Sequence, residues 1–332
     1  MNRLRRLAAN FLAARPSEIV FTSGGTESNN LAILGTVRPL LRAGQKVHLL
    51  TTIAEHASVL EVLNELVREG ATLTRLAVGS DGRLDLLALK KSLRPETALI
   101  SLAYANNETG VIQPVTEIAK ILRGHRAKQN DVWPLFHLDA CQAPQFLELK
   151  VARSGVDLLT LNGAKLGALG AGLLYVKTGV KLWPIIFGGG QERGWRSGTE
   201  NVPAIRAFSQ ALEHCAKTQK KESERLIKLR DGLIKGLLAL PGASLNGHPT
   251  ERLPNNVNVT FADVETEQLV LELDAKGVAT SSGAACSSNT KTDDIIIKSG
   301  LRLTLNQKTT KADLDYVLKI LPPIINRLRK FK

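Results

Sequence analysis

One lysine and one aspartate carry the strongest chemical signal in this sequence of 332 residues. Lys165 lies among small residues at 161–172, between apolar runs at 157–161 and 173–176, and Asp139 ends another apolar run. Pyridoxal 5′-phosphate (PLP) needs a lysine amine for a Schiff base and a carboxylate for its pyridine nitrogen. The pair therefore predicts an enzyme that uses this cofactor.

Asp139 is the second residue of this pair, and a buried carboxylate stays ionised only where a positive charge or hydrogen-bond donors stabilise it. It follows Leu135, Phe136 and Leu138, so its carboxylate is expected to be partly buried and to need a cationic partner. A protonated pyridine ring would be such a partner and would act as an electron sink for a Cα carbanion. The alternative is a helix N-cap, in which Gln142 completes a capping box.

Residues 23–28, Ser-Gly-Gly-Thr-Glu-Ser, follow an expected strand at 18–22 and open an expected helix. Paired glycines, a hydroxyl and a helix N-terminus suit a phosphate group, although a tight turn explains the same pattern. The spacing matches neither G-x-x-x-x-G-K-S/T nor G-x-G-x-x-G, which disfavours mononucleotide and dinucleotide binding.

Three further segments have both a structural and a functional interpretation. His56 lies at a strand-to-helix junction, where a lone histidine is usually a cap or a satisfied core residue. Residues 104–110 suit a turn, or amide donors aimed at a ligand oxygen. Residues 188–201 suit a flexible surface loop, or an anion contact through Arg193, Arg196 and Thr199.

The cysteines indicate a reducing compartment. Cys141, Cys215 and Cys286 make an odd number without a CxxC pair, which disfavours a disulfide framework and predicts a cytoplasmic protein. Cys286 lies among small and polar residues and is the candidate reactive thiol, whereas Cys215 lies in a helical pattern and is expected to be structural.

The composition excludes several classes of protein. With 43% hydrophobic and 23% charged residues, the chain is typical of a globular protein, and no apolar run approaches the ~20 residues of a membrane span. The net charge of +13 is dispersed and aromatic residues make up 4%, which disfavours stable nucleic-acid binding. Residues 1–15 are basic, but their helical spacing favours a surface helix over a targeting segment.

Strand-like runs alternate with helix-period segments, which predicts an α/β fold with a mainly parallel sheet covered on both faces. A long helix at 201–240 then leads to a smaller α/β domain, with strands near 256–261 and 301–305 and a closing helix at 311–329. We place the domains at 1–207 and 208–332. The seven runs are 18–22, 46–52, 72–78, 97–104, 134–140, 158–161 and 172–177.

Six motifs in this order resemble the cysteine desulfurases of the class V aminotransferase family, and the resemblance covers about residues 5 to 330. It implies PLP-dependent transferase fold type I, with a seven-stranded sheet and a smaller C-terminal α/β domain carrying the catalytic-cysteine loop. The motifs lie at 21–28, 55–56, 106–110, 137–142, 188–201 and 281–287.

The resemblance assigns roles to matching residues. Lys165 resembles the Schiff-base lysine, and Asp139 the partner of the pyridine nitrogen. His56 resembles the imidazole that stacks on the ring and assists proton transfer, and Arg302 resembles the arginine that grips the substrate carboxylate. Further cofactor contacts are implied for Gly25, Thr26, Asn107 (which would also touch substrate), Gln142, Asn162 and Thr199, the last on the phosphate of a neighbouring subunit.

The implied reaction converts L-cysteine to L-alanine and leaves a persulfide on Cys286, for iron–sulfur cluster assembly or tRNA thiolation. The implied protein is a homodimer that passes sulfur to an iron–sulfur scaffold or a tRNA-thiolation enzyme, without metal or membrane. Alternatives are another class V PLP enzyme, such as a selenocysteine lyase or an aminotransferase, or a non-catalytic homologue that binds a partner. A metal hydrolase built on His137, Asp139 and Cys141 is a further alternative.

The sequence departs from the family pattern at four places. An N-terminal arm of the family is not matched, so we expect a truncated N-terminus. Ala164 and Asn162 stand where the family usually has a histidine and a serine, and the segment between Cys286 and Arg302 is shorter. These departures predict weaker PLP binding or lower activity, although Asn162 can still donate a hydrogen bond.

Overall fold

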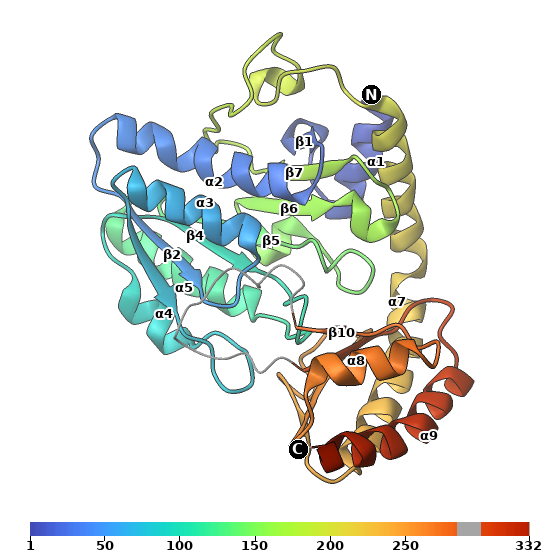
Figure 1. Ribbon diagram of the computed structural model, residues 1–332. Coiled ribbons are helices and arrows are strands. Elements are labelled where there is room, and N and C mark those ends of the chain that lie inside the picture. The colour runs from blue at the N-terminus through green and yellow to red at the C-terminus, as the bar shows by residue number, and fades with distance from the viewer. Residues whose placement is uncertain (284–299, 332) are drawn as a thin grey trace. The chain divides into compact units, whose positions relative to one another are not determined.

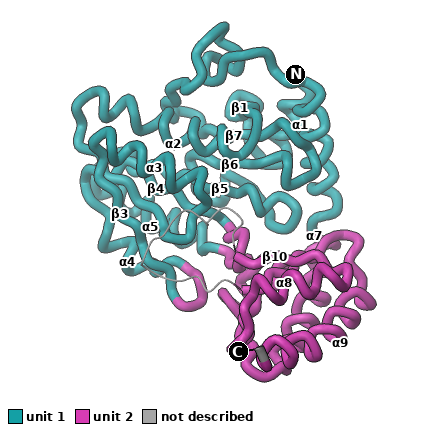
Figure 2. The backbone as a smooth tube through the Cα atoms, in the orientation of Figure 1, with its two compact units in different colours: residues 1–79, 84–104, 113–219 teal, residues 80–83, 105–112, 220–332 magenta. Residues whose placement is uncertain are grey.

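The computed structural model describes residues 1–283 and 300–331 (Figure 1). The chain forms two compact units, coloured separately in Figure 2. Unit 1 contains residues 1–79, 84–104 and 113–219, and unit 2 contains 80–83, 105–112 and 220–332. The chain passes from one unit to the other within helix α7 (Val202–Leu238), and the boundary we placed at 207/208 falls in the same helix.

Unit 1 is built on a seven-stranded sheet in the order β1-β7-β6-β5-β4-β2-β3. Strands β2 to β6 pair in parallel, and β7 runs antiparallel to both of its neighbours. The predicted mainly parallel seven-stranded sheet is therefore confirmed. The strands are β1 (Ile19–Thr22), β2 (His48–Thr52), β3 (Thr72–Leu76), β4 (Thr97–Ala103), β5 (Leu135–Asp139), β6 (Leu158–Asn162) and β7 (Gly172–Val176).

Helices cover both faces of this sheet because successive strand residues point to opposite sides and both sides are apolar. Phe136 and Leu138 join a core cluster with α1, α4, α5 and the start of α7. Leu135 joins a second cluster with α2 and α3, which lie together on the other face (Figure 1). The helices are α1 (Asn2–Leu12), α2 (Gly25–Arg42), α3 (Ala57–Arg68), α4 (Leu86–Ser92), α5 (Val115–Gln129) and α6 (Val151–Ser154).

Unit 2 contains the predicted smaller α/β domain. Its sheet is antiparallel, in the order β10-β11-β9-β8, and helix α9 begins at a capping box formed by Thr310 and Asp313. The strands are β8 (Ala243–Leu245), β9 (Asn256–Phe261), β10 (Ser281–Ser282) and β11 (Leu301–Thr304), and the helices are α8 (Thr266–Asp274) and α9 (Lys311–Leu328). None of the described helices of the chain combines the length and apolar character needed to cross a bilayer.

Candidate active site

Asp139 is the last residue of β5, and its side chain is buried with 8% of the residue exposed. Its Oδ2 accepts a hydrogen bond from Asn29 Nδ2 at 2.8 Å, and its Oδ1 accepts one from the backbone N–H of Cys141 at 3.0 Å. Neither donor is charged. None of the ion pairs within the described residues includes Asp139. A buried carboxylate of this kind is suited to an incoming cation.

The capping-box interpretation of Asp139 is wrong. The residues after β5 form turns, and the next helix, α6, begins only at Val151. Asp139 instead closes a local turn through the N–H of Cys141, two residues further on. Asp139 thus lies at the carboxyl end of β5, where ligands bind in open α/β folds.

His56 is the N-cap residue of α3, and its Nδ1 accepts a hydrogen bond from the backbone N–H of Ser58 at 3.1 Å. The Ser58 hydroxyl lies 2.8 Å from the same nitrogen and 2.9 Å from Nδ2 of Asn29. Asn29 also contacts Asp139, so the structure connects His56 to Asp139 through two residues that sequence reasoning missed. The available signal for Asn29 is weak, because it is one of three polar side chains that α2 buries, with Ser28 and Thr36.

Glu55 places a second carboxyl group near Asp139. Its Oε1 accepts a hydrogen bond from the Thr52 hydroxyl at 2.6 Å, while Oε2 is buried without a partner in the described structure, although the residue as a whole is partly exposed. Burial of the carboxyl raises the pKa of Glu55 to about 8. The hydrogen bond from Thr52 lowers this pKa, and the negative charge of Asp139 raises it. At neutral pH Glu55 is therefore mainly protonated.

Glycine at position 25 allows three segments to meet. A Cβ atom there would lie 2.9 Å from Cys141 Sγ and 3.2 Å from Asn162 Cβ, closer than side chains normally approach. The first turn of α2, the turn after β5 and the end of β6 therefore converge at this point. The free backbone N–H groups of a helix N-terminus attract anions, and the exposed Thr26 adds a hydroxyl.

Asn162 can contribute a donor to the same cradle. Its Oδ1 accepts a hydrogen bond from the backbone N–H of Ala164 at 3.1 Å, which fixes the carboxamide and leaves Nδ2 available. Nδ2 would lie 3.3 Å from a Cβ at Gly25. The asparagine therefore supplies an N–H group where the family pattern has a hydroxyl.

Lys165 lies in a short 3-10 turn (Gly163–Leu166) immediately after β6, and its residue is exposed. Its backbone carbonyl accepts a hydrogen bond from Gln145 Nε2 at 2.8 Å. A Cβ on Gly163 would come within 2.6 Å of two carbonyl oxygens, so the turn is tightly packed. The backbone of Lys165 is thus held in place, while none of the ion pairs in the described structure engages its amine.

Cys141, which sequence reasoning considered only as a metal ligand, lies at this site. Burial raises the pKa of its thiol well above the usual value, the charge of Asp139 adds to the shift, and Lys165 acts in the opposite direction. Lys165 and Asp139 therefore lie within electrostatic range of one thiol, which connects the two residues of the original prediction. Because the thiol stays neutral, Cys141 is not suited to act as a nucleophile.

The loop at 188–201 is anchored to the rest of unit 1, and the two arginines expected to contact an anion are hydrogen-bonded within the chain. Arg196 Nε bonds Glu27 of α2 at 2.8 Å, and Arg193 Nη2 donates to the carbonyl of Ile19 at 2.6 Å. These guanidinium groups are used internally. Thr199, in the same loop, is exposed, and Gln142 is half-buried in the turn after Asp139.

Unit 2 brings together the two residues predicted to contact substrate. Nη1 of Arg302, on β11, donates to the backbone carbonyl of Asn107 at 3.1 Å, while its Nε is buried without a partner in the described structure. The following carbonyls of this segment are also held by side chains of unit 2. Glu108 O accepts from Asn256 and Asn258, both at 3.0 Å, and Thr109 O accepts from Arg252 at 2.6 Å.

The predicted nucleophile, Cys286, lies outside the described residues, as does most of the segment that joins it to Arg302. The metal-hydrolase alternative is wrong. His137 Nδ1 lies 2.8 Å from Ser101 Oγ and Nε2 lies 3.0 Å from Thr160 Oγ1, so both ring nitrogens are used inside the sheet. No group of three potential metal ligands is present within the described part of the chain.

Comparison with known proteins identifies the family. The model of the family described as Aminotransferase class-V matches residues 1–317. "Cysteine desulfurase 2" of Trichormus variabilis is 42% identical over 341 residues, covering 99% of this chain and 83% of that protein. "Cysteine desulfurase IscS" of Methanosarcina thermophila is 42% identical over 340 residues, covering 99% of this chain and 82% of that protein.

Solved structures agree with this result. A "NifS-like protein" is 31% identical, with a TM-score of 0.89 and coverage of 98% of this chain and 87% of that chain. DndA from Streptomyces lividans is 33% identical, with a TM-score of 0.77 and coverage of 91% and 87%. The chain belongs to the class V aminotransferase family, with the fold of its PLP-dependent members. The two relatives compared above are named cysteine desulfurases, and the resemblance inferred from the motifs is confirmed.

Proposed function

We propose that this protein is a PLP-dependent cysteine desulfurase that converts L-cysteine to L-alanine and retains the sulfur as a persulfide on Cys286. The observation that carries the proposal is Asp139, a buried carboxylate with two neutral donors and no ion pair in the described structure, which shares its surroundings with Lys165. The identity of 42% with cysteine desulfurases, over nearly the whole chain, supports the choice of substrate.

The residues of unit 1 fit the cofactor. Asp139 would hold the pyridine nitrogen and Lys165 the aldehyde carbon, while Gly25, Thr26 and Asn162 would hold the phosphate. When bound, the cofactor supplies an electron sink for the negative charge that develops at the substrate Cα. His56, Asn107, Gln142 and Thr199 are the further contacts in this proposal.

The substrate carboxylate would bind Arg302, because a guanidinium fork matches a carboxylate in two parallel hydrogen bonds and this side chain has donors to spare. Lys165 would take the Cα proton. The Cys286 thiolate would attack the substrate sulfur, forming an S–S bond as the Cβ–S bond breaks. L-Cysteine and the Cys286 thiol thus give L-alanine and a persulfide, without an external oxidant or reductant.

The sulfur would then pass to an acceptor protein, such as an iron–sulfur scaffold or a tRNA-thiolation enzyme. We propose a homodimer in which Thr199 reaches the phosphate of the neighbouring subunit. Thr199 is exposed, and its loop is anchored by the contact between Arg196 and Glu27, which is consistent with this role. The odd number of cysteines supports a cytoplasmic location.

Cofactor trapping tests the proposal most directly. Purified protein is loaded with PLP, reduced with borohydride and mapped by mass spectrometry. We expect the reduced adduct on Lys165 and its loss in Lys165→Ala, but not in the control Lys181→Ala, which removes an exposed lysine. An unmodified Lys165 in a cofactor-saturated sample would contradict the proposal.

Product analysis then tests the reaction. With L-cysteine and a reductant, the parent should release alanine and sulfide in equal amounts, and Cys286→Ala should lose sulfide release. Parent-rate sulfide release by Cys286→Ala would show that another group is the nucleophile. A keto acid product would instead indicate transamination, and a protein that takes up no cofactor would indicate a non-catalytic homologue.

A further inference from the structure

A chain of hydrogen bonds joins Asp139 and His56, two residues that the proposed function places in contact with the cofactor ring. Asn29 Nδ2 lies 2.8 Å from Asp139 Oδ2 and 2.9 Å from Ser58 Oγ, and Ser58 Oγ lies 2.8 Å from His56 Nδ1. Asn29 and Asp139 are buried, and they are 110 positions apart in the sequence. All four residues belong to unit 1.

The direction of these bonds follows from the carboxylate. Asp139 can only accept, so Asn29 must present its N–H₂ group to it, because a flipped carboxamide would set oxygen against oxygen. The second N–H of the same group then points to Ser58 Oγ, and both hydrogens are used. Asn29 Oδ1 is left buried without a partner in the described structure, which shows that the contact with Asp139, rather than its own oxygen, fixes its orientation.

The hydroxyl hydrogen of Ser58 determines the tautomer of the His56 ring. Because Ser58 Oγ accepts from Asn29, its own hydrogen is available to the imidazole. His56 Nδ1 then faces two donors, the Ser58 hydroxyl at 2.8 Å and the Ser58 backbone N–H at 3.1 Å. A nitrogen that accepts both cannot carry a proton, so a neutral ring must carry its proton on Nε2.

We propose that Asn29 and Ser58 are positioning residues that fix the Asp139 carboxylate and hold His56 as the tautomer protonated on Nε2. This inference, which rests on the proposed function, assigns a role to two residues outside the predicted site. Asn29 holds the carboxylate that would face the cofactor nitrogen. Through Ser58 it also sets the ring orientation, so that His56 directs an N–H donor away from its own helix.

Four variants test this relay. Asn29→Ala removes both of its donors, and Ser58→Ala removes the hydroxyl but keeps the backbone N–H that bonds His56. Ser58→Thr restores a hydroxyl at the same position. The control is Asn64→Ala, which removes an asparagine whose side-chain oxygen accepts a hydrogen bond from the exposed Arg75.

The first readout needs neither cofactor nor activity. The ¹⁵N signals of the His56 ring, assigned by their loss in His56→Gln, are recorded at a pH where the imidazole is neutral. In the parent and in Asn64→Ala we expect a protonated Nε2 and an unprotonated Nδ1. In Ser58→Ala both signals should move towards the average of the two tautomers, and Ser58→Thr should restore them. Equal spectra for Ser58→Ala and the parent would overturn the relay.

The second readout separates the two ends of the relay. Asn29→Ala should weaken the affinity for PLP by about 10–100-fold, since it removes a hydrogen bond to a buried charge. Ser58→Ala should leave PLP affinity within about twofold and lower kcat about tenfold, without a matching change in KM. If the relay is correct, kcat of the Asn29→Ala/Ser58→Ala double variant should be nearly the same as kcat of Asn29→Ala. If the two residues act independently, the two fold-losses in kcat should multiply.

These outcomes distinguish the relay from the proposed function. A parent protein that binds no PLP or releases no alanine would refute the function, while the ring spectra still report on the relay. A fully active parent with multiplicative kcat losses, or with Ser58→Thr as impaired as Ser58→Ala, would refute the relay alone.

Discussion

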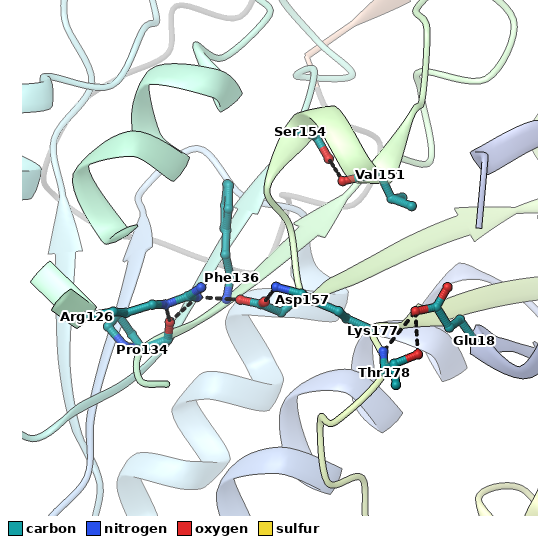
Figure 3. A network of polar contacts seen from close by, with 9 residues as sticks. All are labelled: Glu18, Arg126, Pro134, Phe136, Val151, Ser154, Asp157, Lys177 and Thr178. Carbon is teal, nitrogen blue, oxygen red and sulfur yellow. Dashed lines mark hydrogen bonds and ion pairs between the residues drawn. The ribbon is translucent and has the colours of Figure 1, made fainter. Parts of the chain in front are cut away.

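Two buried carboxylates lie at opposite ends of neighbouring strands of the same sheet, and their hydrogen-bond partners differ in charge. We call the two ends of these strands the two edges of the sheet. Asp157, at the start of β6, accepts from the Arg126 guanidinium, from Lys177 Nζ at 3.0 Å and from the N–H of Phe136 at 2.9 Å (Figure 3). Asp139, at the end of β5, has two neutral donors and no ion pair in the described structure. The exposed fractions of the two residues are only 2% and 8%.

The nearby glutamates repeat this contrast. Glu18 accepts from the N–H and the hydroxyl of Thr178 at 2.9 and 2.8 Å (Figure 3), and its pKa is lowered by hydrogen bonds from Arg15 and Thr178 although burial opposes them. Burial instead raises the pKa of Glu55, on the other edge, to about 8. At the first edge, Asp157 is paired with two cationic side chains. At the second edge, Asp139 has only neutral hydrogen-bond donors in the described structure. We interpret the first as structural and the second as functional.

The largest effect should come from Asp139→Asn. Removing the charge but not the volume should lower desulfurase activity by about 10³-fold, because the pyridine nitrogen would lose its partner, while the free energy of unfolding should stay the same or rise. Steady-state kinetics with L-cysteine and urea unfolding measure the two quantities. A loss of stability with activity retained would reverse our interpretation of this edge.

Asp157→Asn should show the opposite pattern. It leaves Arg126 without its carboxylate partner in a mostly buried position, so unfolding should become easier by about 3–4 kcal/mol. PLP affinity of the folded protein, measured by absorbance titration, should stay within about twofold. If the variant were as stable as the parent, the Asp157 network would not be the structural anchor that its contacts indicate.

Glu55→Gln should stabilise the protein in alkaline solution only. The raised pKa means that the native state holds a proton which the unfolded state releases above about pH 4.5, so native stability declines as the pH rises towards 8. The glutamine stays neutral and avoids this loss, so the variant should be more stable than the parent by roughly 2–3 kcal/mol at pH 8.5. Urea unfolding at pH 4.5 and pH 8.5 tests this, and an equal difference at both pH values would contradict it.

The smallest effect concerns His137, which lies between the two edges in β5. Burial lowers its pKa to about 4, so the unfolded state binds a proton below about pH 6.5 that the native state does not take up until about pH 4. This residue should therefore destabilise the fold by roughly 2 kcal/mol as the pH falls from 6.5 to 4. His137→Asn should flatten that part of the stability curve, even if its overall stability is lower. An unchanged slope would show that other groups cause the loss.

The sequence was most informative where chemistry and local structure coincide. Lys165 and Asp139 could be singled out because each follows an apolar strand-like run, and parallel strands end at the same edge of a sheet. The role of His56 as a helix cap could also be predicted from the local sequence, because a cap residue contacts its own helix. The substrate-binding roles of Arg302 and Asn107 came only from the resemblance, and the hydrogen bond between these residues, 195 positions apart, is seen only in the structure.

Other features depended on contacts that no local pattern contains. In the sequence, Asn29 is one of several polar residues in the first turns of α2, and only the fold shows that it contacts Asp139. Arg193 and Arg196 looked available to an anion because the sequence does not reveal that Ile19 and Glu27 already hold them.

By itself, the sequence determined the strands, the helices and the residue types able to carry the chemistry, because strand and helix periodicities and turn residues act over short distances. Only the tertiary structure decided which buried carboxylate would be neutralised. That choice depends on the order β1-β7-β6-β5-β4-β2-β3, which places Lys177 and Arg126 at Asp157 and gives Asp139 a neutral amide. Charges compensate one another only at short range, and the fold sets those distances.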